Sequence, residues 1–497
     1  MDLPTALQSI QPPRQHRINV RLPHTPGYLL ASLAVSLGGF LNGFDTGSIG
    51  AVTDMEQFAE TFGVLSPQLR GFTVSLIMLT GVIPSFFAGQ MADKLGRLQV
   101  VSMGATIFAI GAALQAGASH LAMLLVGRAL CGFGQGMWVS NIVVYISEIA
   151  PAKTRGVMVS LPQLVTSSAI CFGYFTCYGS VKIHGSMAWR LPFIIMASAA
   201  MLLVIVCYIL PQSPRWLMAR GRREEAEREL QKLGVSRAEA EKDILSQVQA
   251  APSLSLWGSL ALIFRRPYRR MTGMALFVLG MVQLCGIDGV LYYAPTLFKQ
   301  AGLPGQEATF LASGVSAILM LAISIPGTLF ADRWGRRTAI ISGGLMLSGS
   351  MLLIGSLYAS DSVHAYGSGR WVVVVSIFAF ALAYCFTWNV TAKLVACEIQ
   401  PANTRAAAIC TAQGLNFFSN WLVAFATPIF LANSSSGAYF LYGALSLFTV
   451  IVLWISMPET RGRSLEDIQQ SLQRPVRWGL KFSRPKVKAL SGFHCLF

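Results

Sequence analysis

The sequence predicts an all-α membrane protein made of two homologous halves, and three observations lead to this prediction. Of the 497 residues, 54% are hydrophobic and only 12% are charged, with a mean hydropathy of +0.55. Soluble domains carry about twice that charged fraction. The chain also contains twelve apolar stretches, each near the length of about 20 residues that crosses a bilayer as a helix. Finally, one charged corner occurs twice: Glu, Ile, Pro, Ala, Thr and Arg recur in the same order in 147–155 and 397–405.

The apolar stretches give the expected helices in chain order. Loops between them are short, except for one long polar segment after the sixth stretch. We expect membrane-spanning helices over 27–50, 70–91, 99–118, 121–146, 157–178, 189–210, 271–297, 308–330, 338–358, 370–396, 406–431 and 437–457.

Further motifs recur between the halves. Asp93 to Arg97 returns as Asp332 to Arg337, and a looser echo of 211–215 occurs at 458–463. Self-similarity at a fixed period marks duplicated structural units. Two related membrane halves are typical of secondary transporters, whose substrate site lies between the halves near the middle of the bilayer.

The chain divides into five segments. We expect a cytoplasmic tail over 1–26, a six-helix bundle over 27–210, a cytoplasmic helical linker over 211–270, a second six-helix bundle over 271–457 and a cytoplasmic tail over 458–497. Lys and Arg concentrate in the linker and the second tail, while the opposite loops are poor in them. Because such residues favour the cytoplasmic side, both termini are predicted to be cytoplasmic, in a multi-pass protein of the plasma membrane.

Composition also excludes several classes of function. The net charge of +16 follows the expected cytoplasmic loops, so it does not indicate nucleic-acid binding. The nine Cys lie mostly within apolar stretches, and no His lies in the middle of one. We therefore expect no metal site, no cofactor and no enzyme, and the sequence has no glycine loop for a nucleotide. The first apolar stretch is too long for the core of a signal peptide.

A buried ion pair is the first candidate for function. Asp45 lies in the first apolar stretch and Arg128 in the fourth, and a charge at such a depth is costly on insertion scales, by about 2.5–3.5 kcal/mol. We expect the two to pair and to act in function. The alternative is that Asp45 lies near the outer end of its helix and is simply hydrated.

The seventh stretch contains an acid and two bending points. Asp288 and Tyr292 are four residues apart and therefore share a helix face. Gly286 and Gly289 make this helix easy to bend. Asp288 is accordingly a candidate to line a polar cavity.

The tenth and eleventh stretches add more polar groups. Lys393 lies five residues before Glu398, about one and a half turns deeper in the membrane. Asn416 and Asn420 share a face of the eleventh helix. These side chains complete a predicted polar lining in the second half.

The motifs above resemble those of the sugar porter family of the major facilitator superfamily. The resemblance covers about residues 27–470, and the segment 458–465 is similar to the fungal members. It rests on Gly127-Arg128, Tyr145 to Pro151, Pro211 to Leu217, Gln283 to Tyr293, Asp332 to Arg337, Glu398 to Arg405 and Pro458 to Thr460.

This resemblance implies the major facilitator fold, with twelve transmembrane helices in two six-helix bundles that work by alternating access. It matches Asp45 and Arg128 to the proton-coupling pair of the symporters. It implies a cytoplasmic gate of Asp93, Arg97, Glu148, Arg155, Asp332, Arg336, Glu398 and Arg405. It implies substrate contacts from Asn42, Gln163, Gln283, Asp288, Tyr292, Tyr293, Lys393, Asn416 and Asn420.

Several of these positions depart from the family pattern. The departures are Asn42, Val282, Asp288, Met320, Lys393 and Phe417. Three interpretations of Lys393 stay open: it pairs with Asp288 across the cavity, it binds a carboxylate of the substrate, or it reaches the cytoplasmic interface.

The resemblance predicts a proton-coupled transporter of a monosaccharide or a similar polyhydroxy compound, working as a monomer in the lipid bilayer. The alternatives are an importer of a sugar-like acid such as quinate or a uronate, an exporter of a secondary metabolite, and a nutrient sensor without transport. Asn433 begins a glycosylation sequon, although the very short turn argues against its use.

Overall fold

The computed structural model describes residues 27–151, 154–234, 256–302, 306–364, 367–401 and 404–459. Every secondary-structure element in these ranges is a helix. The first half consists of α1 (Gly27–Val35), α2 (Leu37–Thr53), α3 (Glu56–Phe62), α4 (Pro67–Leu95), α5 (Arg97–Ala116), α6 (Leu121–Ile149), α7 (Arg155–Ser180) and α8 (Met187–Ile209).

The second half repeats this plan after three short helices. The short helices are α9 (Pro214–Ala219), α10 (Arg223–Leu233) and α12 (Leu256–Ile263). The second half consists of α13 (Arg269–Leu284), α14 (Ile287–Tyr292), α15 (Ala294–Gln300), α16 (Gln306–Trp334), α17 (Arg336–Ala359), α18 (Ser368–Phe386), α19 (Trp388–Glu398), α20 (Arg405–Asn433) and α21 (Gly437–Ser456).

The predicted membrane spans are present. Eleven helices of the described chain are long and apolar enough to cross a membrane. The predicted span 308–330 is α16, a helix of 29 residues whose described apolar part is Leu311–Gly327. It completes the twelve spans of the two six-helix bundles.

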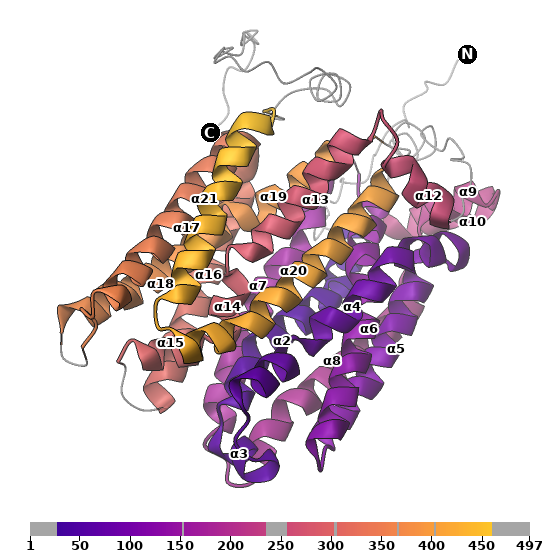
Figure 1. The fold of residues 1–497 in the computed structure, drawn as a ribbon. Coiled ribbons are helices and arrows are strands. Elements are labelled where there is room, and N and C mark those ends of the chain that lie inside the picture. The colour runs from indigo at the N-terminus through magenta and orange to yellow at the C-terminus, as the bar shows by residue number, and fades with distance from the viewer. Residues whose placement is uncertain are drawn as a thin grey trace, which may run out of the picture.

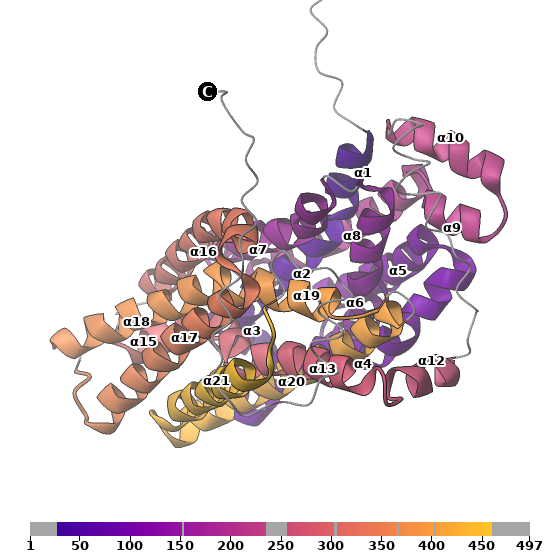
Figure 2. The ribbon, with the colours of Figure 1, turned by 90° about the horizontal axis from the view of Figure 1, so that it is seen from above.

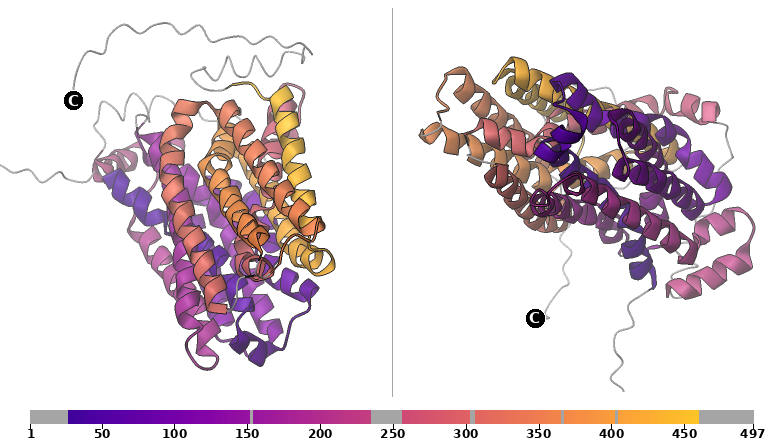
Figure 3. Two further views of the ribbon diagram at one scale, coloured as in Figure 1. Left: turned by 90° about the vertical axis from the view of Figure 1, so that its left-hand side faces the viewer. Right: turned by 90° about the horizontal axis from the view of Figure 1, so that it is seen from below.

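The two halves lie side by side (Figures 1 and 2). Each half has an apolar core, to which the other half adds a few residues where the two halves meet. Between the halves, α4 packs along α20 and α7 packs along α16. The helices α9, α10 and α12 lie at one end of the bundle, called here the linker end, and α3 and α15 lie toward the other, called here the α3 end (Figures 1 and 3). The residues 1–26, 235–255 and 460–497 of the predicted tails and linker lie outside the described chain.

The seventh span bends at Gly286, one of the two glycines at which a bend was predicted. Helix α13 ends at Leu284, and Gly286 has a φ of 91° before α14 begins. That left-handed backbone favours glycine, because a Cβ atom would clash with the following carbonyl oxygen. The bend turns α14 into the space between the halves, where it contacts α2, and thereby positions Asp288.

Candidate substrate cavity and coupling pair

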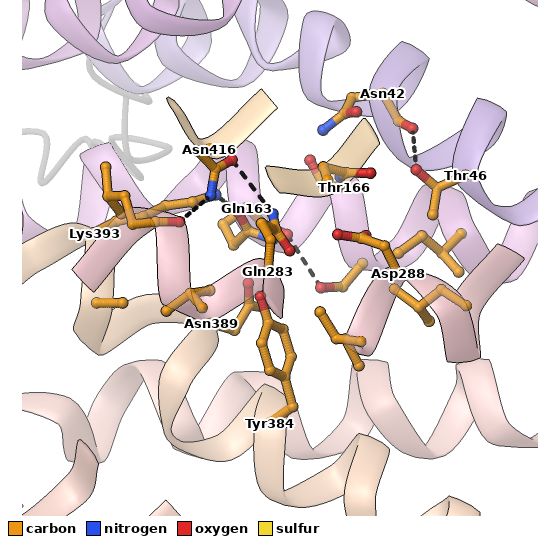
Figure 4. Close-up of a pocket in the computed structure, with 18 of the residues that line it drawn as sticks. Asn42, Thr46, Gln163, Thr166, Gln283, Asp288, Tyr384, Asn389, Lys393 and Asn416 are labelled. Carbon is orange, nitrogen blue, oxygen red and sulfur yellow. Dashed lines mark hydrogen bonds between the residues drawn. The ribbon is translucent and has the colours of Figure 1, made fainter. Parts of the chain in front are cut away.

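A polar cavity lies between the two halves. Helices α2, α4, α6 and α7 line it from the first half, and α13, α14, α16, α18, α19 and α20 line it from the second. Figure 4 shows its polar side chains. Its polar side chains are Asn42, Thr46, Gln163, Thr166, Ser167, Gln283, Asp288, Tyr384, Asn389, Lys393, Gln413, Asn416 and Asn420.

The structure brings together all the predicted substrate residues except two. Tyr292 and Tyr293 are not part of the lining; each is only 1% exposed and packs between the halves. The hydroxyl of Tyr293 donates to the carbonyl of Ala424 at 2.8 Å. Their packing assigns them to the contact between halves rather than to the cavity.

Six polar lining residues were absent from the predicted set: Thr46, Thr166, Ser167, Tyr384, Asn389 and Gln413. Polarity within an apolar stretch is the only sequence signal that marks them. It does not show which helix face looks into the cavity, since that depends on the neighbouring helices.

An amide network holds one wall of the cavity. The amides of Gln283 and Gln413 each donate to Asn416 Oδ1 at 3.3 Å, and Asn416 Nδ2 donates to the carbonyl of Leu279 at 2.8 Å. On the other half, Gln135 Nε2 donates to Asn42 Oδ1 at 2.7 Å. Fixed amides can both donate to and accept from hydroxyl groups, so the wall suits a polyhydroxy ligand.

Lys393 reaches across the cavity to the opposite half. Its Nζ donates to Gln163 Oε1 on α7 at 2.6 Å (Figure 4). Its side chain is exposed and lines the cavity. Among the described side chains, no salt bridge within 4.0 Å joins it to Asp288, although the two charges attract each other through space.

Asp45 and Arg128 form a buried, two-pronged ion pair. Arg128 Nη1 donates to Asp45 Oδ1 at 2.9 Å and Nη2 donates to Oδ2 at 3.2 Å. Nη2 also donates to the carbonyl of Val74 on α4 at 2.7 Å. Asp45 is 1% exposed and Arg128 is fully buried, so the hydrated position considered for Asp45 is wrong. The pair lies beside the cavity, which the next residue, Thr46, lines.

The predicted gate residues cluster at the linker end, within each half. Arg97 pairs with Asp93 and with Glu148 at 3.1 Å, and Ser213 before α9 also donates to Glu148. Gly96, between α4 and α5, has a φ of 114° and makes a tight turn.

The second half repeats this arrangement. Arg336 pairs with Glu398 at 3.0 Å. Arg405 donates to the carbonyl of Gln400 at 3.2 Å, and Arg155 donates to that of Ala150 at 3.5 Å. The side chain of Asp332 lies outside the described residues.

A polar cluster that the sequence did not reveal joins the halves at the α3 end; it is called here the outer clamp. Arg70 pairs with Asp54 at 2.8 Å, and Thr296 from α15 donates to the same carboxylate at 2.9 Å. Arg70 also donates to the Thr296 hydroxyl at 3.2 Å and lies over the Tyr293 ring at 5.4 Å. This end of the cavity is therefore closed by contacts between the halves.

Duplicated helices with a polar cavity between them are typical of a secondary transporter. Comparison with known proteins identifies its family. The family model for "Sugar (and other) transporter" matches residues 31–472. The chain belongs to this family. It is therefore a multi-pass membrane transporter with the major facilitator fold, and not an enzyme.

Several relatives agree with this family. The chain is 30% identical to "Sugar transport protein MST7" of Oryza sativa, over 90% of this chain and 92% of the relative. It is 30% identical to "MFS-type transporter criB" of Aspergillus cristatus, over 88% and 92%. Among solved structures, the proton:xylose symporter XylE bound to 6-bromo-6-deoxy-D-glucose matches with a TM-score of 0.73 at 24% identity, covering 90% of this chain and 99% of that one.

Proposed function

We propose that this transporter carries a monosaccharide or a similar polyhydroxy compound together with a proton, by alternating access. The observation that carries the proposal is the position of the buried Asp45–Arg128 pair beside a cavity lined by amides and hydroxyls. Relatives named as a hexose cotransporter and a proton:xylose symporter support both parts of it.

The pair provides a physical route for coupling. With Asp45 ionised, both carboxylate oxygens hold the guanidinium of Arg128. A proton on Asp45 removes the charge attraction, while Arg128 keeps its proton under all physiological conditions. Arg128 then loses its charged partner and keeps only neutral acceptors such as the carbonyl of Val74, so α2, α4 and α6 can shift relative to one another. Because Thr46 is on the same turn as Asp45 and lines the cavity, that shift reaches the substrate.

We place the linker end in the cytoplasm and the outer clamp on the external side, in the plasma membrane, with a monomer as the working unit. The Lys and Arg content of the linker supports this orientation. The segments 27–210 and 271–457 then act as the moving bodies, and 211–270 connects them. The ion pairs of Arg97 and Arg336 would serve as the cytoplasmic gate.

The test is uptake by purified protein in liposomes with an imposed proton gradient. Wild type is expected to accumulate substrate above the outside concentration and to lose this ability with an uncoupler. Asp45→Asn is expected to keep exchange of substrate but to lose accumulation, whereas Glu60→Gln, an exposed acid on α3, leaves accumulation unchanged. Full accumulation by Asp45→Asn would contradict the coupling role.

A further inference from the structure

The two charged side chains of the cavity are incompletely paired by the protein. Asp288 on α14 and Lys393 on α19 are the ionisable acid and base in its lining. They lie at opposite sides of the close-up view, with Gln283 between them (Figure 4). Both belong to the second half, so their spacing is set within one bundle.

Lys393 offers an unused site for an anion. An ammonium group has three N–H donors, and Lys393 uses one of them in the hydrogen bond to Gln163 Oε1 at 2.6 Å. The amide of Gln163 is neutral, and Asp288 acts on the ammonium only through space, without forming an ion pair with it. An ammonium that lines a cavity and has no anion in direct contact can stabilise an anionic ligand there.

Asp288 has the opposite requirement. The residue is only 7% exposed, and its Oδ2 atom is buried without a hydrogen-bond partner in the described chain. A buried carboxylate oxygen without a donor is costly, and a hydroxyl of the ligand can satisfy it. A second carboxylate near this atom would be repelled.

The amide wall extends the polar surface between the two charges. Gln283 and Asn416 are tied to each other, and Asn420 interacts with Asp288. A ligand that spans this wall meets a positive group at one end and hydrogen-bond acceptors at the other. The cavity therefore also fixes the orientation of an acidic ligand.

We propose that the cavity selects a polyhydroxy monocarboxylate, a sugar acid, over the neutral sugar of the same stereochemistry. The carboxylate lies against Lys393, and hydroxyl groups lie along the amides and donate to Asp288. This inference rests on the proposed function, because it names the substrate class of the same cavity.

The experiment compares matched pairs of substrates in liposomes that contain the purified protein. Galacturonate is compared with galactose, and glucuronate with glucose, because each pair differs only at the terminal carbon. Glucosamine serves as the cationic probe. The variants are Lys393→Gln, Lys393→Arg and Lys299→Gln, the last being an exposed lysine of α15 outside the cavity.

Wild type is expected to take up at least one acid about 10–100-fold better than its neutral partner, the ratio that a hydrogen-bonded charge provides. Lys393→Gln is expected to lose this preference, while Lys393→Arg and Lys299→Gln keep it. The arginine variant distinguishes a lost charge from a lost fold.

Three results would overturn the inference. Proton-coupled uptake of neutral sugars with no preference for acids would refute it and leave the proposed function intact. Preference for glucosamine would assign the site to Asp288 and a cation instead. Uptake of none of these compounds, with intact protein in the liposomes, would contradict the proposed function as well.

Discussion

The buried pair of Asp45 and Arg128 predicts an asymmetry between its two single variants. Asp45→Asn leaves the guanidinium fully buried, with the carbonyl of Val74 at 2.7 Å as its remaining strong acceptor. Breaking a buried pair in this way costs about 3–5 kcal/mol. At about 2–4 °C per kcal/mol for a unit the size of one half, we expect a fall in Tm of roughly 6–20 °C.

The opposite variant, Arg128→Gln, behaves differently because a carboxyl group can take up a proton. The free energy needed for that uptake falls by about 1.4 kcal/mol for each unit of acidification. Between pH 8 and pH 6 the destabilisation by Arg128→Gln should therefore shrink by up to about 2.7 kcal/mol. Asp45→Asn should show no such recovery, because arginine does not lose its proton in proteins. The double variant should be more stable than Asp45→Asn alone.

The assay is thermal unfolding of the purified protein in detergent at both pH values, each variant being compared with wild type at the same pH. Glu60→Gln on the exposed face of α3 is the matched control for loss of an acid. An equal pH response of the two single variants would refute the reasoning. So would a fall in Tm for Asp45→Asn no larger than that of the control.

Two further predictions concern contact between the halves at the α3 end. A Cβ atom added at Gly50 would lie 1.5 Å from the carbonyl oxygen of Tyr292, whereas one at Gly179 would meet nothing within 4 Å. Overpacking costs about 1–3 kcal/mol, so Gly50→Ala should lower the transport rate by roughly 5–150-fold. Gly179→Ala should transport like wild type. Equal transport rates for the two variants would contradict the close approach of Gly50 to Tyr292. Thr296→Val removes the hydroxyl that donates to Asp54 across the halves. The distance between spin labels on the turn before α4 and on the turn between α17 and α18 reports how far the halves separate at this end. The variant should show a larger population of long label distances than wild type. An unchanged distance distribution would show that the outer clamp does not hold this end closed.

Much of the candidate site was predictable because ionisable and amide groups are rare in membrane spans. Asp45, Arg128, Asp288 and Lys393 each interrupt an apolar stretch, and such interruptions persist where function needs them. The same argument could not separate Tyr292 from the cavity. Aromatic residues are common both in cavity walls and in helix contacts. Packing alone therefore decides whether such a side chain faces the cavity or a neighbouring helix.

The sequence by itself determined the twelve spans, the duplication and the glycine that bends the seventh helix. These follow from local properties: apolar length sets a membrane helix, and a left-handed backbone favours glycine. The tertiary structure alone decided that Lys393 meets Gln163 instead of Asp288, and that Asp54, Arg70 and Thr296 meet at one end. These contacts join residues that lie 16 (Asp54 and Arg70) to 242 (Asp54 and Thr296) positions apart in the chain. They depend on how the two bundles face each other, which short-range sequence patterns do not contain.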